Sequence, residues 1–204
     1  MDAKLRTVLD RLELEMERED GLRATLPAAE WQARRKDLML AIGPEAGRFL
    51  NLLVKAASAQ RVLELGTSAG YSTLWLADAV RETGGGVVTL DRNASKHAQA
   101  ARNLAEAGLA RYVELLTAEA AAGIRTLSGP FDFVLLDADR SAYVACFQAF
   151  SPLLRPGGLA VADNMAFPNA AETQPYRDAV RGHRDYESVA VPIGNGLELS
   201  RKLR

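Results

Sequence analysis

The chain has 204 residues, with 25 basic and 26 acidic side chains and a formal net charge of −1, which suits one domain and argues against nucleic-acid binding by bulk electrostatics. Hydrophobic residues make up 48% of the chain, which is enough for a sizeable core and excludes global disorder. One cysteine and two histidines exclude a disulfide framework and a cysteine- or histidine-rich metal site, so a metal here would need oxygen ligands.

The N-terminal segment is predicted to be helical. In residues 3–18, apolar side chains recur on one face at helical spacing, and Gly21 is expected to end this helix. Residues 27–40, headed by a proline, are expected to form a second helix, and 45–57 a third. The N-terminus lacks an apolar signal core and no apolar run is long enough for a membrane span, which favours a cytoplasmic protein.

After this segment the pattern changes to short runs rich in Val and Leu, separated by helical stretches. Such runs are typical of strands buried on both faces, and their alternation with helices predicts a parallel sheet. The expected strands are 61–65, 87–91, 112–116, 132–136 and 158–163, and the expected helices are 70–81, 94–108, 119–127 and 140–153.

The C-terminal runs 186–191 and 197–203 flank Asn195-Gly196, which predicts an antiparallel hairpin at the end of the sheet. We therefore predict a single α/β domain over residues 1–204, with a helical extension at 1–57 and a core at 58–204.

Glu64, Gly66 and Gly70 belong to a strand–turn–helix motif at residues 62–72. The glycines let the backbone approach a ligand at the carboxyl edge of the sheet. Their G-x-x-x-G spacing differs from the dinucleotide pattern G-x-G-x-x-G, and Glu64 would attract a cationic group and repel a pyrophosphate. S-adenosylmethionine carries an ammonium and a sulfonium, so the motif favours it over a nicotinamide cofactor and makes a dehydrogenase the weakest interpretation.

Asp91 ends the next strand, where a carboxylate can accept both hydroxyls of a ribose. Dinucleotide-binding folds share this position, so Asp91 supports a nucleoside ligand without choosing one.

Oxygen-bearing side chains end the fourth and fifth strands: Asp137, then Asp163 and Asn164. Neighbouring parallel strands bring their carboxyl ends together, and two adjacent carboxylates without a cation would raise a pKa or destabilise the fold. A hard divalent cation resolves this repulsion, with Mg²⁺ expected and Mn²⁺ or Ca²⁺ as alternatives. The other interpretation is that each acid caps the following helix.

These motifs together resemble the cation-dependent O-methyltransferases, the group that contains the catechol and caffeoyl-CoA enzymes. LELGT-x-x-GYST, LLDAD, ADN and GNGLEL occur in family order, and the match covers about residues 38–203. The resemblance implies a seven-stranded Rossmann-like methyltransferase sheet, mostly parallel with an antiparallel last strand, and with helices on both faces.

The resemblance also assigns roles. It implies that S-adenosyl-L-methionine contacts lie at Ile42 (backbone), Glu64 (amino group), Gly66 and Ser72 (amino-acid portion), Asp91 (ribose), Glu119 and Ala120 (adenine), and Asp137. It implies that Asp137, Asp163 and Asn164 bind the metal.

Arg140 departs from the family pattern, because many members carry a lysine there that deprotonates the acceptor hydroxyl. Arginine stays protonated, so Arg140 would instead stabilise a phenolate, and the base would be water, a nearby carboxylate, or nothing beyond metal acidification. Glu198 matches a catechol-binding acid of the animal enzyme and is assigned a catalytic role with Asp137 and Arg140. His97 is expected on a helix surface.

The predicted function is divalent-metal-assisted O-methylation of a small catechol-like or phenolic acceptor. A tRNA hydroxyuridine O-methyltransferase is an alternative, with a basic rim at Arg34-Arg35-Lys36 and at Arg177, Arg181 and Arg184. A non-catalytic S-adenosylmethionine-binding protein is another. The resemblance favours a homodimer, and the apolar stripe of residues 5–16 would pack either internally or across it.

Overall fold

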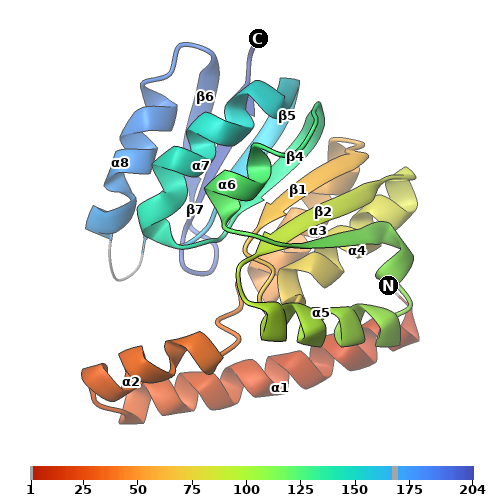
Figure 1. Ribbon diagram of the computed structural model, residues 1–204, viewed down its shortest axis with the longest axis vertical. Coiled ribbons are helices and arrows are strands. Elements are labelled where there is room, and N and C mark those ends of the chain that lie inside the picture. The colour runs from red at the N-terminus through yellow and green to blue at the C-terminus, as the bar shows by residue number, and fades with distance from the viewer. Residues whose placement is uncertain (1, 167–169) are drawn as a thin grey trace.

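The computed structural model describes residues 2–166 and 170–204, apart from the side chains at positions 32 and 36, and its centre is a seven-stranded sheet (Figure 1). The strands are β1 (Arg61–Leu65), β2 (Gly86–Asp91), β3 (Val113–Thr117), β4 (Phe131–Leu136), β5 (Leu154–Ala162), β6 (Tyr186–Val191) and β7 (Leu197–Lys202). Their order is β3-β2-β1-β4-β5-β7-β6. Strands β1 to β5 pair in parallel, and β7 is antiparallel to both β5 and β6. The predicted sheet and its closing hairpin are confirmed.

Helices cover both faces of this sheet. Successive side chains of a strand point to opposite faces, so strands rich in consecutive apolar residues need cover on both sides. The helices are α1 (Ala3–Thr25), α2 (Ala28–Arg34), α3 (Pro44–Ala56), α4 (Tyr71–Thr83), α5 (Ala94–Glu106), α6 (Ala120–Ile124), α7 (Tyr143–Phe150) and α8 (Ala170–Arg181). One apolar cluster joins Val62 and Phe133 to α1, α3, α4 and α5, and a second joins Leu63 and Val134 to α6, α7 and α8.

The helical N-terminal segment packs on the first of these clusters. The predicted stripe of α1 turns inward, with Leu5, Val8, Leu9 and Leu12 buried against α4 and α5. The second half of α1 extends past this contact and lies beside α2 (Figure 1). The stripe therefore packs internally. The division of the chain at residue 57 remains a prediction.

Three local features differ from the sequence-based expectations. Helix α1 continues through Gly21 to Thr25, because glycine inside a helix costs only about 1 kcal/mol and does not break it. The second helix ends at Arg34 and gives way to a 3₁₀ turn, Arg35–Asp37. Helix α8 was not predicted, because it contains Pro175 and few apolar residues. Within the described residues, no helix is both long and apolar enough to cross a membrane.

Candidate functional site

The predicted ligand loop connects β1 to α4 at the carboxyl edge of the sheet. Gly66 has a φ of +108°, and a Cβ at this position would lie 2.0 Å from the carbonyl oxygen of Asp137. Gly70 has a φ of +87°, and its Cβ would lie 3.0 Å from the Cβ of Ala100 on α5. Both positions require glycine for the chain's own packing. This packing holds the loop against the end of β4.

Glu64 lies beneath this loop and is fully buried. Its Oε1 accepts a hydrogen bond from Ser72 Oγ (2.6 Å), and its Oε2 accepts from Thr73 Oγ1 (2.5 Å) and Thr89 Oγ1 (2.6 Å). Burial raises the pKa of Glu64 to about 7, although the hydroxyls favour its charged form. The structure therefore brings Glu64 and Ser72 together and seats both under the loop.

A chain of buried hydrogen bonds extends from Glu64 to the next strands. Thr89 contacts Thr67 of the loop through their hydroxyls (2.6 Å), and Thr67 Oγ1 lies 3.1 Å from His97 Nε2. The other ring nitrogen of His97 lies 2.9 Å from Thr117 Oγ1. His97 is buried, so its prediction as a surface residue is wrong. Its burial lowers the pKa of the imidazole, which favours the neutral ring in this network.

Asp91 lies at the carboxyl end of β2, beside the loop. Its Oδ2 accepts from the backbone N–H of Ser68 (2.8 Å), and its Oδ1 accepts from the backbone N–H of Asn93 (2.8 Å). Asn93 in turn caps α5. Asp91 stays half-buried, so the carboxylate predicted to bind a ribose borders the loop and remains accessible.

Ile42 belongs to a segment that three other elements hold in place. Glu19 of α1 is buried and accepts from the backbone N–H groups of Met39 (2.6 Å) and Leu40 (3.0 Å). Lys96 Nζ donates to the carbonyl of Leu38 (2.6 Å), and Ser68 Oγ donates to that of Met39 (2.7 Å). The contacts of Glu19 and Lys96 with residues 38–40 could not be predicted, because no local pattern near either residue indicates them.

The strongest electrostatic feature lies where β4 and β5 end. Asp163 is 1% exposed, and its Oδ1 has no hydrogen-bond partner. Burial raises the pKa of Asp163 to about 7. Burial, followed by the charges of Asp163 and Glu64, raises the pKa of Asp137 well above its ordinary value. Asn164 has a φ of +60°, and its Nδ2 donates to Asp137 Oδ1 (2.8 Å). The structure thus brings together the three predicted metal ligands.

These residues fit a hard divalent cation. Two neighbouring carboxylates with raised pKa values and an unpartnered buried oxygen are destabilised when both are charged, and a cation removes that cost. The set consists of two carboxylates and an amide. No group of three or more His, Cys, Asp and Glu side chains suited to a metal occurs in the described part of the chain.

Three further predicted residues, Glu119, Ala120 and Arg140, follow β3 and β4. Glu119 precedes α6, is exposed and pairs with Arg92 (3.3 Å), and Ala120 begins that helix. Arg140 follows β4, and its Nε donates to Glu172 Oε2 of α8 (2.7 Å). Arg140 is therefore already paired with a carboxylate beside the acidic edge.

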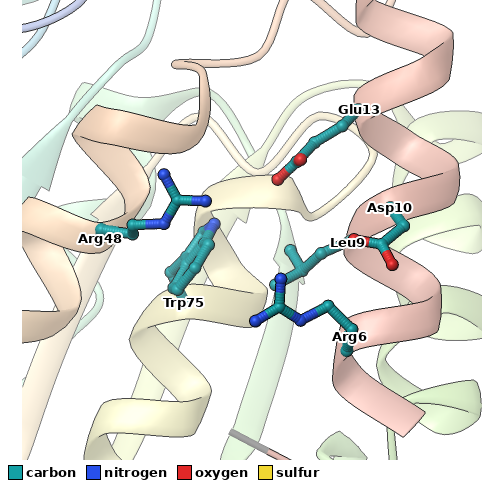
Figure 2. Close-up of a pocket in the computed structure, with 6 residues that line it drawn as sticks. All are labelled: Arg6, Leu9, Asp10, Glu13, Arg48 and Trp75. Carbon is teal, nitrogen blue, oxygen red and sulfur yellow. The ribbon is translucent and has the colours of Figure 1, made fainter. Parts of the chain in front are cut away.

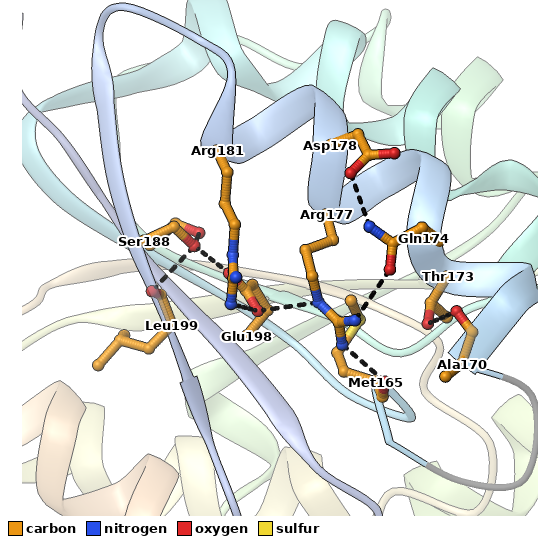
Figure 3. Close-up of polar contacts among 11 residues, drawn as sticks. Met165, Ala170, Thr173, Gln174, Arg177, Asp178, Arg181, Ser188, Glu198 and Leu199 are labelled. Atoms are coloured by element: carbon orange, nitrogen blue, oxygen red, sulfur yellow. Dashed lines mark hydrogen bonds and ion pairs between the residues drawn. The ribbon is translucent and has the colours of Figure 1, made fainter.

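Glu198 of β7 pairs in register with Ala162 of β5, and its side chain belongs to a cluster with α8 (Figure 3). It is 0% exposed. Its two oxygens accept from Arg181 Nε (2.6 Å) and Nη2 (3.0 Å), and Oε1 also accepts from Ser188 Oγ (2.6 Å). Although burial alone would raise its pKa, these bonds hold it below the ordinary value. Both oxygens of the predicted catechol-binding acid are thus already bonded to Arg181, and one of them also to Ser188.

The arginines of the predicted basic rim differ in their surroundings: some face Glu198, and others are exposed. Arg181 and Arg177 face Glu198, with Arg177 Nε 3.5 Å from Oε2. Arg184 is exposed and lies 3.7 Å from Asp185. Arg34 is exposed at the end of α2, and the side chain of Lys36 lies outside the described residues.

A small pocket on the helical side is separate from this edge (Figure 2). It lies between Glu13 of α1, Arg48 of α3 and Trp75 of α4, and Trp75 Nε1 is buried without a partner. Its volume is about 10 Å³, roughly the room that one water molecule needs. This pocket can hold a water that accepts from Trp75, and it is too small for a substrate.

The strand order defines a doubly wound α/β protein, a class of fold in which ligands bind at the carboxyl ends of the parallel strands. A family model described as O-methyltransferase matches residues 27–203. The chain belongs to this O-methyltransferase family, which confirms the family inferred from the motifs.

Individual relatives agree with this assignment. A catechol O-methyltransferase of Niastella koreensis is 40% identical over 130 residues, covering 62% of this chain and 58% of the relative. One of Mycobacterium tuberculosis is 44% identical over 128 residues, covering 62% and 57%. The chain thus spans less than two thirds of the length of these two relatives.

Solved structures match over more of the chain. The O-methyltransferase TomG from Streptomyces achromogenes, in complex with SAM, has a TM-score of 0.79 and 28% identity, covering 100% of this chain and 91% of that one. An O-methyltransferase from Bacillus cereus, in complex with SAH, has a TM-score of 0.76 and 26% identity, covering 99% and 91%.

Proposed function

We propose that this protein transfers a methyl group from S-adenosylmethionine to a hydroxyl of a small phenolic or catechol-like acceptor, assisted by a divalent cation. The observation that carries the proposal is the buried Asp163, whose Oδ1 has no hydrogen-bond partner, together with the half-buried Asp137, which adjoins the Gly66 loop. A divalent cation between these two carboxylates would relieve their mutual repulsion. The names and bound ligands of the relatives support the same chemistry.

In this proposal the cofactor lies along the loop edge. Asp91 accepts the ribose hydroxyls, Gly66 and Ser72 contact the amino-acid portion, and the backbone of Ile42 contacts the cofactor. Glu64 acts through Ser72, because its own oxygens are occupied by hydroxyls. Glu119 and Ala120 border the adenine. The roles of these residues rest on family resemblance and on their position at this edge.

Asp137, Asp163 and Asn164 would hold the cation with oxygen ligands, and Mg²⁺ is the expected ion. When bound, the cation supplies positive charge that lowers the pKa of an acceptor hydroxyl. Arg140 adds a fixed positive charge at the same edge and cannot serve as a base, because a guanidinium stays protonated. The proton passes to water or to a neighbouring carboxylate.

In the transfer itself, the acceptor oxygen bonds to the methyl carbon as the carbon–sulfur bond breaks. The electron pair of that bond stays on sulfur, and the products are a methyl ether and S-adenosylhomocysteine. The chain's contribution is to hold the two reactants in line at near-attack distance. We further propose a homodimer in the cytoplasm, as the family resemblance implies.

The test is methyl transfer from S-adenosylmethionine to catechol with Mg²⁺, before and after EDTA treatment. EDTA and Asp137→Ala should each lower the rate about 100-fold or more, and added Mg²⁺ should restore only the wild type. Calorimetry with S-adenosylhomocysteine is the control, since the variant should keep much of its affinity. A wild-type rate after EDTA treatment, or in Asp137→Ala, would rule out cation assistance. Failure to bind S-adenosylhomocysteine would contradict the whole proposal.

A further inference from the structure

A second pocket adjoins the acidic edge and is large enough for a ligand. Its volume is about 320 Å³, near the lower end of the roughly 300–1,000 Å³ typical of ligand pockets. Met165, which follows Asn164 directly, forms one wall, and Val191, Pro192 and Leu197 of the β6–β7 hairpin form another. The Met165 N–H donates to the Gly196 carbonyl (2.9 Å), and this hydrogen bond connects the segment after β5 to the β6–β7 hairpin. The pocket is therefore apolar and the size of a single-ring ligand.

Arg177 of α8 is the charged residue among those that line this pocket (Figure 3). Its Nη2 donates to the Met165 carbonyl (2.8 Å), and its Nη1 donates to Gln174 Oε1 (3.1 Å). Its Nε is buried without a hydrogen-bond partner. A guanidinium has five N–H groups, so these two bonds fix its orientation and leave donors for a ligand.

The two arginines of α8 are paired unequally with the carboxylates around them. Arg177 and Arg181 share one carboxylate, Glu198, and Arg181 already binds both of its oxygens at 2.6 and 3.0 Å. Arg177 lies farther away, with its Nε 3.5 Å from Glu198 Oε2. Asp178 also acts on Arg181, whereas Arg177 makes no hydrogen bond to a carboxylate, so its guanidinium faces an otherwise apolar wall. An anionic group in the pocket would gain a charge-assisted bond there, whereas a second cation would be repelled.

We propose that this pocket takes the methyl acceptor and that Arg177 selects acceptors that carry an anionic group, in particular single-ring phenols with a carboxylate. The inference rests on the proposed function, and it specifies the acceptor class. The apolar walls take the ring, and Arg177 takes the carboxylate. Glu198 then acts as a positioning residue, since it sets the charge and orientation of the arginines.

The first test measures binding without a cation or turnover. Calorimetry in EDTA compares 4-hydroxybenzoate with 4-hydroxybenzamide, which has a similar shape and no charge. The acid should bind the wild type about 10-fold or more tightly than the amide, because charge-assisted bonds are about twice as strong as neutral ones. Arg177→Gln should remove this preference, and Arg177→Lys should keep part of it. Equal or undetectable binding of both compounds to the wild type overturns the proposal.

The second test measures methyl transfer with Mg²⁺, using 3,4-dihydroxybenzoate and 3,4-dihydroxybenzamide. Arg177→Gln should lower kcat/KM about 10-fold or more for the acid and little for the amide. Arg184→Gln is the matched control: it removes the same charge from an exposed residue outside the pocket and should leave the ratio unchanged. An equal fall for both substrates overturns the role of Arg177. No transfer to either compound, with preferential binding of the acid intact, overturns the proposed methyl transfer and leaves the anion pocket standing.

Discussion

The acid at the end of β5 and the acid on β7 are equally buried, yet their surroundings are opposite. Asp163 is 1% exposed and has an oxygen without a partner, and its pKa is raised to about 7. Glu198 is 0% exposed, and Arg181 and Ser188 hold its pKa below the ordinary value. Burial is common to both acids, so it does not identify a ligand site. The two acids differ in their hydrogen-bond partners, and the unpartnered oxygen of Asp163 is what supports its proposed role as a metal ligand.

The largest effect is expected at the unpaired acid. Asp163→Asn should lower methyl transfer about 100-fold or more, because the cation loses a charged ligand. In cation-free buffer the variant should be at least as stable as the wild type, since a like-charge contact with Asp137 is gone. Thermal unfolding with and without Mg²⁺ checks this: Mg²⁺ should raise the Tm of the wild type only. A clear loss of stability in cation-free buffer would make Asp163 a structural acid like Glu198.

The paired acid should behave in the reverse way. Glu198→Gln should lower the free energy of unfolding by about 2–3 kcal/mol, because it leaves Arg177 and Arg181 without their shared counter-ion. Urea unfolding measures this loss. Glu187→Gln is the control, since its exposed pair with Arg201 should be worth at most about 1 kcal/mol. A fall in kcat with unchanged stability would favour the predicted role of Glu198 in binding a catechol.

The stabilities of the wild type and Glu198→Gln should also differ in their dependence on pH. The pKa of Glu198 is lower in the folded protein than in the unfolded chain. Its contribution is therefore fully present above the unfolded pKa and is lost as the pH falls through the folded pKa. The stability gap between the wild type and Glu198→Gln should be constant near neutral pH and shrink below about pH 4.5. A gap that widens on acidification would contradict the pairing.

The smallest effect is expected at Glu19, another buried acid. Backbone N–H groups of Met39 and Leu40 donate hydrogen bonds to both of its carboxylate oxygens. Glu19→Gln should raise the Kd for S-adenosylhomocysteine about 3–10-fold, because the segment before Ile42 loses charge-assisted bonds. The value of kcat at saturating cofactor should change much less. Calorimetry and a comparison of KM with kcat measure both effects. Glu17→Gln, on the exposed face of α1, is the control, and an equal change there would remove any special role for Glu19.

The sheet could be predicted because its signals are local. Strands buried on both faces of a parallel sheet are rich in consecutive apolar residues, as in 133–136, and the Asn-Gly pair signals the final turn. Asp137, Asp163 and Asn164 could be predicted to meet because parallel strands align their carboxyl ends. In contrast, α8 has only Thr173, Tyr176 and Val180 buried, which is too sparse a stripe to detect next to Pro175.

Partners distant in the sequence could not be predicted. Glu198 meets Arg181 across a strand and a loop, and Glu19 meets Met39 across an entire helix. Periodicity identifies which face of an element is buried, but it does not identify which polar side chains pair there. His97 shows the same limit, because its partners Thr67 and Thr117 belong to other elements.

The contact between Gly66 and Asp137 has a consequence for redesign. Because a Cβ at position 66 would lie 2.0 Å from the Asp137 carbonyl oxygen, the Gly66 loop and the end of β4 cannot shift independently. A substitution that moves the backbone at residue 66 will therefore also move the backbone at residue 137, and the reverse. Under the proposed function, substitutions that change the acceptor are best made in the β6–β7 hairpin and α8, whose residues line the proposed acceptor pocket.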